Sequence, residues 1–231
     1  MSIEENVEKV QREIAQAALA AGRKPEEVVL CAATKMNDSA AVRRAIAAGV
    51  RVCGENRVQE LTRKLEENAY EGAEVHFIGH LQTNKVRQVV GKVDLIQSVD
   101  SLRLLEAISR EAQRQGIRQD ILLEVNIGGE EAKSGFAPEE LSQAAQEAKK
   151  CENVRVRGLM CIPPVAEGEH GSLPYFEKVH ALFVDINAKL YDNTLDILSM
   201  GMSGDYEDAV RAGATMVRVG TAIFGARNYT I

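Results

Sequence analysis

The chain has 231 residues, of which 45% are apolar and 27% charged, an ordinary composition for a soluble globular protein with a substantial core. Its 34 acidic and 28 basic residues give a net charge of −6, and no Lys/Arg run exceeds a pair, which argues against nucleic acid as the main partner. No run of 18 apolar residues predicts a membrane span, and the acidic N-terminus lacks the apolar stretch of a signal peptide.

Four cysteines are scattered along the chain without a C-x-x-C spacing: Cys31, Cys53, Cys151 and Cys161. Three of them lie inside apolar runs, as small buried hydrophobic residues do. We therefore expect neither a disulfide framework nor a zinc site, and a reducing, cytoplasmic environment. No cluster of His, Cys, Asp and Glu has metal-ligand spacing, so we expect no metal site.

The apolar positions of residues 2–22 recur with helical spacing and end at Gly22 and Pro25, which predicts an N-terminal helix. Apolar runs then alternate with amphipathic segments. We expect strands at Val28–Thr34, Val50–Gly54, Val75–Gly79, Leu95–Val99, Ile121–Ile127, Val154–Ile162, Leu195–Met200 and Met216–Phe224. We expect helices at Ser39–Ala48, Arg57–Asn68, Asn84–Val90, Ser101–Gln115, Pro138–Lys149, Leu173–Leu190 and Asp205–Ala212.

Eight strands that are apolar on both faces and separated by helices predict an α/β fold, a closed parallel (β/α)8 TIM barrel. No Pro/Gly/Ser linker divides the chain, so residues 1–231 are predicted to form a single domain, with the extra N-terminal helix covering the bottom of the barrel. An open doubly wound sheet is the competing interpretation. That fold favours a glycine-rich fingerprint directly after the first strand, whereas this strand ends in Ala32-Ala-Thr-Lys35, which favours the barrel.

In such a barrel the chemistry belongs at the C-terminal ends of the strands. The seventh and eighth strands are followed by turns that contain Ser203 and Gly204, and Gly220 and Thr221. Glycines mark ordinary tight turns in every protein, but these two strand ends are the usual phosphate site of this fold. Backbone N–H groups with little side-chain bulk around them suit a phosphate.

Lys35 ends the first strand, next to the eighth after the barrel closes. One interpretation is a lysine that caps a strand and reaches solvent. The other is a desolvated amine with a lowered pKa, able to form an imine. Together with the phosphate turns, Lys35 points to a phosphorylated aldehyde held as a Schiff base.

Other polar residues near the strand ends allow two interpretations each. Arg218 lies within an apolar strand, where it either forms a buried ion pair, with Glu55 or Glu124, or hydrogen-bonds a ligand. Asn56, His80 and Asn126 are ligand contacts or loop-capping residues. His76 stands at the start of its strand, the wrong end for chemistry, and receives no role.

Several motifs together resemble the pyridoxal phosphate homeostasis protein family, short single-domain relatives of the alanine racemase barrel. The resemblance covers nearly the whole chain. It is carried by Ala33-Thr-Lys35, Gly54-Glu-Asn-Arg-Val-Gln-Glu60, His76-Phe-Ile-Gly-His-Leu-Gln-Thr-Asn-Lys85, Lys133-Ser-Gly135, Gly158-Leu-Met160, Leu198-Ser-Met-Gly-Met-Ser203 and Val217-Arg-Val-Gly220.

The resemblance implies that pyridoxal 5′-phosphate is the cofactor and that Lys35 carries it as a Schiff base. It implies a phosphate site at Ser203, Gly220 and Thr221, with Gly204 in the same turn, Arg218 facing the pyridine nitrogen, and Asn56 lining the pocket. The family often has Ser before the lysine; Thr34 keeps that hydroxyl.

A binding protein that holds and hands over pyridoxal phosphate is the function we expect. Arg218 is a permanent cation that cannot take a proton from the pyridine nitrogen, which makes the cofactor a weaker electron sink. Alanine racemases also use a tyrosine from a C-terminal β domain of the partner subunit, and no such domain is expected in the few residues between Gly225 and Ile231. We expect a monomer that buffers the cofactor or delivers it to apo-enzymes that require it. The alternatives are a pyridoxal-phosphate-dependent racemase or related amino-acid enzyme, and a cofactor-free Schiff-base aldolase or isomerase.

Overall fold

Eight parallel strands close into a barrel in the computed structural model, which describes residues 1–130, 133–165, 167–168 and 170–225. The strands are β1 (Val29–Ala33), β2 (Val52–Glu55), β3 (Glu74–Phe77), β4 (Leu95–Val99), β5 (Gln119–Val125), β6 (Val154–Cys161), β7 (Ile197–Ser199) and β8 (Met216–Val219). β8 pairs with β1 and completes the ring, with Arg218 beside Cys31. The predicted barrel is confirmed, and the open sheet is wrong.

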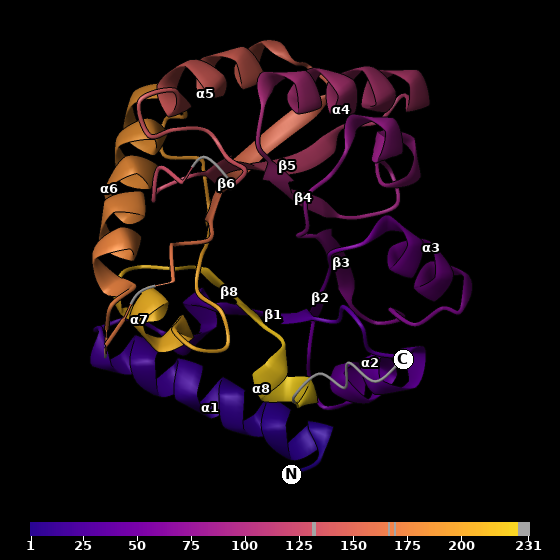
Figure 1. Cartoon of the computed structure of the whole chain (residues 1–231), viewed down its shortest axis with the longest axis vertical. Coiled ribbons are helices and arrows are strands. Elements are labelled where there is room, and N and C mark those ends of the chain that lie inside the picture. Colours follow the sequence, from indigo (N-terminus) through magenta and orange to yellow (C-terminus); the bar gives the residue numbers. More distant parts are fainter. Residues whose placement is uncertain (131–132, 166, 169, 226–231) are drawn as a thin grey trace.

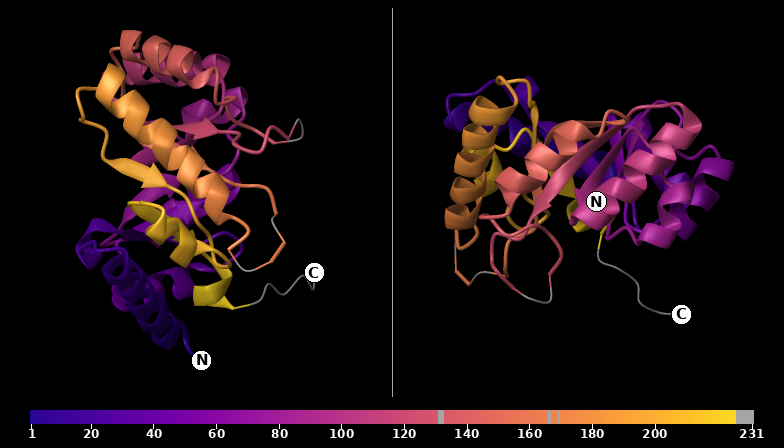
Figure 2. Two further views of the ribbon diagram at one scale, coloured as in Figure 1. Left: turned by 90° about the vertical axis from the view of Figure 1, so that its left-hand side faces the viewer. Right: turned by 90° about the horizontal axis from the view of Figure 1, so that it is seen from above.

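Helices surround the ring of strands (Figure 1). They are α1 (Ile3–Ala20), α2 (Ser39–Ala47), α3 (Val58–Glu66), α4 (Leu102–Gln115), α5 (Leu141–Lys150), α6 (Leu173–Leu190), α7 (Tyr206–Arg211) and α8 (Thr221–Phe224), with 3₁₀ helices η1 (Pro25–Glu27) and η2 (Thr83–Gln88). The side views of Figure 2 show the same outer position of the helices. Within the described ranges, no helix is long and apolar enough to cross a membrane.

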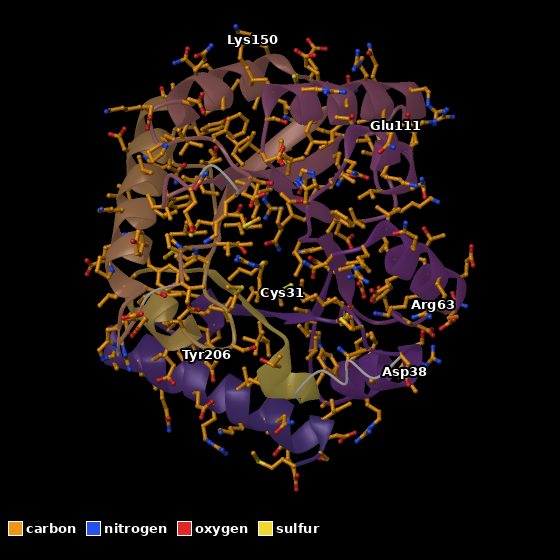
Figure 3. The ribbon with its side chains drawn as sticks, in the orientation of Figure 1. Cys31, Asp38, Arg63, Glu111, Lys150 and Tyr206 are labelled. Carbon is orange, nitrogen blue, oxygen red and sulfur yellow. The ribbon has the colours of Figure 1, made fainter. Side chains whose placement is uncertain are left out.

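Successive strand residues face opposite sides of the barrel wall. Cys31, Val52, Ile78 and Met216 form a small interior cluster. The residues that alternate with them, such as Ala32 and Cys53, belong to the main core between strands and helices. Side chains project into the ring of strands, where Cys31 lies at the inner side of β1 (Figure 3).

The N-terminal helix corrects one expectation. α1 packs against α7, α8 and α2 on the outside of the barrel instead of covering its bottom (Figure 1). Its apolar face, which includes Val7, Val10 and Ile14, joins the main core. α7 and α8 have six and four residues, too few to cover β8 and β1, and α1 supplies the missing outer layer.

Two other elements differ from the prediction. β8 ends at Val219, because the chain turns at Gly220 and forms α8, so the predicted strand to Phe224 is too long. The segment expected as a helix near Asn84–Val90 is the 3₁₀ helix η2. The other elements are confirmed within a few residues at their ends.

Candidate functional site

The end of β1 that carries Lys35 is held by several hydrogen bonds. The Thr34 backbone N–H donates to the Gly54 carbonyl at 2.9 Å, and Thr34 Oγ1 donates to Glu55 Oε1 at 2.5 Å. The Thr34 carbonyl accepts a hydrogen bond from Lys64 Nζ at 2.7 Å. Lys35 itself is half-buried, directly after this anchored residue. The strand end is therefore a rigid base for the lysine side chain.

A buried ionic cluster beneath Thr34 was not anticipated from the sequence. Lys64 and Glu55 have fully buried side chains, and Lys64 Nζ lies 2.5 Å from Glu55 Oε1. Tyr70 donates its hydroxyl to the same oxygen at 3.0 Å. Lys64 sits on the helix that follows β2, so a charged residue at a buried helix position was the available signal.

The two turns after β7 and β8 are joined by one side chain. Ser203 Oγ accepts hydrogen bonds from the backbone N–H of Gly220 at 3.1 Å and of Ala222 at 3.4 Å. Two backbone donors thus converge on one hydroxyl, an arrangement that suits an anion. A Cβ at Gly220 would lie 3.3 Å from the Ala33 carbonyl oxygen, so this turn packs against the end of β1.

A cavity of 810 Å³ lies outside these turns, between them and the helices α1 and α7. Ser203, Gly204 and Thr221 line it, together with Lys9 and Arg211 among others. Lys35, Asn56 and Arg218 do not line it. The cavity therefore extends outward from the turns and is not the interior of the barrel, where chemistry at Lys35 would take place.

Arg218 is 4% exposed and lies on β8 inside the barrel. Its Nη1 donates to Ser199 Oγ at 2.7 Å and its Nη2 to the Cys161 carbonyl at 2.8 Å. Burial lowers the pKa of Arg218 from its ordinary value, although a guanidinium stays protonated. Among the described residues Arg218 has no salt bridge, so the ion-pair interpretation, with Glu55 or Glu124 as partner, is wrong. Glu55 pairs with Lys64 instead.

Glu124 is a second charged group in the barrel interior. Burial, and to a smaller extent the Asp100 charge, raise the pKa of Glu124 to about 7, while Arg218 and His80 oppose the shift. The carboxyl is buried, and its side chain has no hydrogen bond to the part of the chain that the structure describes. Glu124 is thus a titratable group close enough to Arg218 for their charges to interact.

Asn56, His80 and Asn126 have different surroundings. Asn56 Oδ1 is buried and has no hydrogen-bond partner within the described ranges, and buried polar atoms normally have one. His80 Nδ1 lies 3.0 Å from Asp100 Oδ2 and 3.2 Å from Ser134 Oγ. Asn126 Nδ2 donates to the carbonyls of Glu130 and Lys133, which supports its loop-capping interpretation.

The predicted site residues come from neighbouring strand ends. Lys35 follows β1, which lies between β2 and β8 in the ring. Asn56 follows β2, Arg218 and Gly220 belong to β8 and its turn, and Ser203 reaches that turn from β7. Over the residues that the structure describes, no group of three or more His, Cys, Asp and Glu side chains has the geometry of a metal site.

Comparisons of the sequence with known proteins point to one family. The family model described as alanine racemase, N-terminal domain, matches residues 2–228. A pyridoxal phosphate homeostasis protein of Pseudomonas aeruginosa is 44% identical over 231 residues, 99% of this chain and 97% of that protein. A protein of the same name from Aquifex aeolicus is 43% identical over 97% of this chain and 98% of its own length. The chain belongs to the pyridoxal phosphate homeostasis protein family.

A solved structure of another protein, PipY of Synechococcus elongatus with pyridoxal phosphate bound, has the same fold as this family member. The two are 35% identical, with a TM-score of 0.80, over 92% of this chain and all of PipY. The family resemblance expected from the motifs is confirmed.

Proposed function

We propose that this chain binds pyridoxal 5′-phosphate at the C-terminal ends of its barrel strands, with Lys35 Nζ bonded to the aldehyde carbon. The observation that carries the proposal is the packing of the Gly220 turn against the end of β1. It puts a cluster of anion-binding donors beside the strand end that presents a lysine. A phosphorylated aldehyde matches both features at once.

The chain's own residues fit such a ligand. Ser203, Gly204, Gly220 and Thr221 would hold the phosphate, since Ser203 Oγ already gathers backbone donors and a Cβ at Gly204 would meet nothing within 4 Å. Asn56 would satisfy its unpartnered Oδ1 with a polar group of the ligand. Arg218 keeps an Nε–H without a partner among the described residues, and we assign it to the pyridine nitrogen.

We propose that the protein holds and releases pyridoxal phosphate and does not turn over amino acids. Bound pyridoxal phosphate supplies an electron sink for amino-acid chemistry, and its strength depends on a protonated pyridine nitrogen. Arg218 donates hydrogen bonds and accepts none, so it keeps that nitrogen unprotonated. The relatives named homeostasis proteins support the same role. Its partners would be apo-enzymes that take up the cofactor, and we propose a monomer in a reducing cytoplasm.

The first test of the proposal replaces the lysine. We expect Lys35→Ala to abolish the covalent adduct that borohydride reduction leaves on the wild-type protein, with the wild-type adduct located at Lys35 by peptide mass spectrometry. Lys189→Ala is the matched control, because Lys189 is exposed on α6 and pairs with Asp185 of the same helix. An adduct that persists in Lys35→Ala would overturn the site assignment.

A second measurement separates carrier from enzyme. The holo-protein is mixed with an apo-enzyme, and its activation is compared with that given by an equal amount of free cofactor. Activation supports delivery. Turnover of an amino acid by the holo-protein at about 1 s⁻¹ or faster would support the racemase alternative and overturn the carrier proposal.

A further inference from the structure

A continuous chain of buried polar side chains runs through the barrel interior below Arg218. Arg218 Nη1 lies 2.7 Å from Ser199 Oγ, Ser199 Oγ lies 2.6 Å from Gln97 Oε1, and Gln97 Nε2 lies 2.9 Å from His76 Nδ1. The four residues stand on β8, β7, β4 and β3, and all are buried. This hydrogen-bond chain crosses the lumen of the barrel at the Ser199–Gln97 link, which joins β7 to β4, two strands that are not neighbours.

The chemistry of Arg218, at one end of this hydrogen-bond chain, fixes the direction in which every hydrogen bond along it is donated. A guanidinium only donates, so Ser199 Oγ accepts from Arg218 and sends its own proton to Gln97 Oε1. The Gln97 amide then donates from Nε2 to His76 Nδ1, and the same Nε2 lies 3.1 Å from the Met216 sulfur, also an acceptor. His76 therefore carries its proton on Nε2, which faces Glu74 Oε2 at 3.4 Å.

The His76 end of the hydrogen-bond chain borders a cavity of 560 Å³ at the N-terminal ends of the strands, the bottom of the barrel. His76 lines this cavity with Glu74, Asp94, Asp120 and Arg157. Burial is the largest cause of a lowered His76 pKa, about 4, and the charges of Asp94, Arg157 and Asp120 partly offset one another. At neutral pH the imidazole is uncharged, which leaves Nδ1 free to accept from Gln97.

We propose that Ser199, Gln97 and His76 are positioning residues for Arg218, holding its guanidinium in one orientation so that Nε–H meets the ring nitrogen of the bound cofactor. This inference rests on the proposed function for the identity of the ligand. The orientation of Arg218 is a property of the protein alone.

Arg218 depends on this hydrogen-bond chain for its orientation because no carboxylate in the described part of the chain is paired with its charge. Its two bonded neighbours are a hydroxyl and a carbonyl, both neutral, whereas most buried cations are paired with a carboxylate. A chain of hydrogen bonds polarises each member, so the Ser199 oxygen becomes a better acceptor when its proton is held by Gln97. Without Ser199 the guanidinium keeps one bonded neighbour, the Cys161 carbonyl, and the charge of Glu124 still attracts it, so its orientation is less well fixed.

The first experiment examines the protein without cofactor. The ¹⁵N resonances of the Arg218 guanidinium, assigned by their loss in Arg218→Lys, report how fast the group rotates. We expect slow rotation in the wild type and faster rotation in Ser199→Ala and Gln97→Leu. Ser98→Ala is the matched control. It removes a buried strand hydroxyl that donates to the Gly79 carbonyl and is not part of the hydrogen-bond chain to Arg218. Unchanged rotation in Ser199→Ala would overturn the proposal.

The second experiment uses the holo-protein. We expect Ser199→Ala to weaken pyridoxal phosphate binding about tenfold, the effect of losing one hydrogen bond to a charged group, and to shift the visible absorbance of the bound cofactor. Gln97→Leu and His76→Phe should have progressively smaller effects, and Ser98→Ala less than about twofold. If these residues had a purely structural role, the loss of affinity across the variants would follow their loss of stability in urea. That result would count against a positioning role.

A double substitution separates the two proposals. In an Arg218→Lys background, Ser199→Ala should change affinity by less than about twofold, since its effect acts through Arg218. Equal losses in both backgrounds would overturn the positioning role. If the wild type forms no adduct at Lys35, the proposed function fails, while the guanidinium resonances still decide whether the chain orients Arg218.

Discussion

Lys64 shows how a single buried charge can position a neighbouring strand end. Its ammonium is fully buried between Glu55 Oε1 and the Thr34 carbonyl, one residue before Lys35. Taking two charges out of water costs several kcal/mol, which a close ion pair with further hydrogen bonds offsets. Glu55 Oε1 receives three such contacts, from Lys64, Thr34 and Tyr70. The cluster therefore stabilises the base of the proposed cofactor lysine.

We predict that Lys64→Met lowers the free energy of unfolding by about 3–5 kcal/mol, because it leaves the Glu55 carboxylate buried without its partner. Urea denaturation measures the change. Lys9→Met is the control: Lys9 is 47% exposed and its contact with Glu13 is 3.8 Å, so we expect a change below about 0.5 kcal/mol. In Lys64→Met with Glu55→Gln, part of the loss should return. A Lys64→Met protein as stable as the wild type would contradict this account.

The residues of the candidate site were predictable to different degrees. Lys35, Ser203 and Gly220 stood out because each follows an apolar strand, where a barrel keeps its chemistry. The partners of Arg218 were not predictable, since Ser199 and Cys161 are 19 and 57 residues away in sequence. His76 was set aside because the predicted strand begins at Val75, one residue before it, yet the lumen of a barrel connects both ends. Long-range side-chain pairing has no signature in a single sequence.

At the scale of elements, α1 and α8 form a unit that supports the proposed phosphate site. Asn6 of α1 donates from Nδ2 to the Ile223 carbonyl of α8 at 2.8 Å. α8 begins directly after Gly220, and Ala222 of the same helix donates to Ser203 Oγ. A four-residue helix has little stability of its own, so its position depends on such contacts.

We predict that Asn6→Ala weakens pyridoxal phosphate binding severalfold, because α8 loses the contact that holds it at the turn. Its cost in unfolding free energy should be about 1 kcal/mol, the usual worth of one hydrogen bond. Gln11→Ala is the matched control, since Gln11 also joins α1 to a carbonyl, that of Gly49, away from the site. Titration should show an unchanged affinity for Gln11→Ala. Equal affinities of the two variants for pyridoxal phosphate would show that α1 does not support the phosphate site through Asn6.

At the scale of the whole molecule, the barrel was predictable because eight apolar runs alternate with helical segments. The position of α1 was not predictable, because it depends on how short α7 and α8 are. The hydrophobic periodicity of the sequence does not determine those lengths. The polar layer inside the barrel was also missed. Gln97 and Ser199 each interrupt an otherwise apolar strand, a signal in the sequence to which no partner was assigned, and Glu124 was considered only as an ion-pair partner of Arg218.

This interior layer gives the stability of the molecule a pH dependence through Glu124. Burial raises the pKa of Glu124 from 4.5 to about 7, so the folded state binds this proton more tightly than the unfolded state. The contribution to stability is fully present below about pH 4.5 and is lost as pH rises through about 7. By linkage, the loss across this window is at most about 3 kcal/mol.

We predict that Glu124→Gln removes this dependence, because glutamine carries no proton to lose. The measurement is urea unfolding of wild type and variant at several pH values between about 4 and 8, the window set by the two pKa values of Glu124. The wild type should lose stability relative to Glu124→Gln as pH rises through that window. Glu66→Gln, which alters an exposed glutamate of α3, should instead run parallel to the wild type. Parallel curves for Glu124→Gln would show that Arg218 and His80 compensate the buried charge in spite of Asp100, and that the interior carboxyl is ionised throughout.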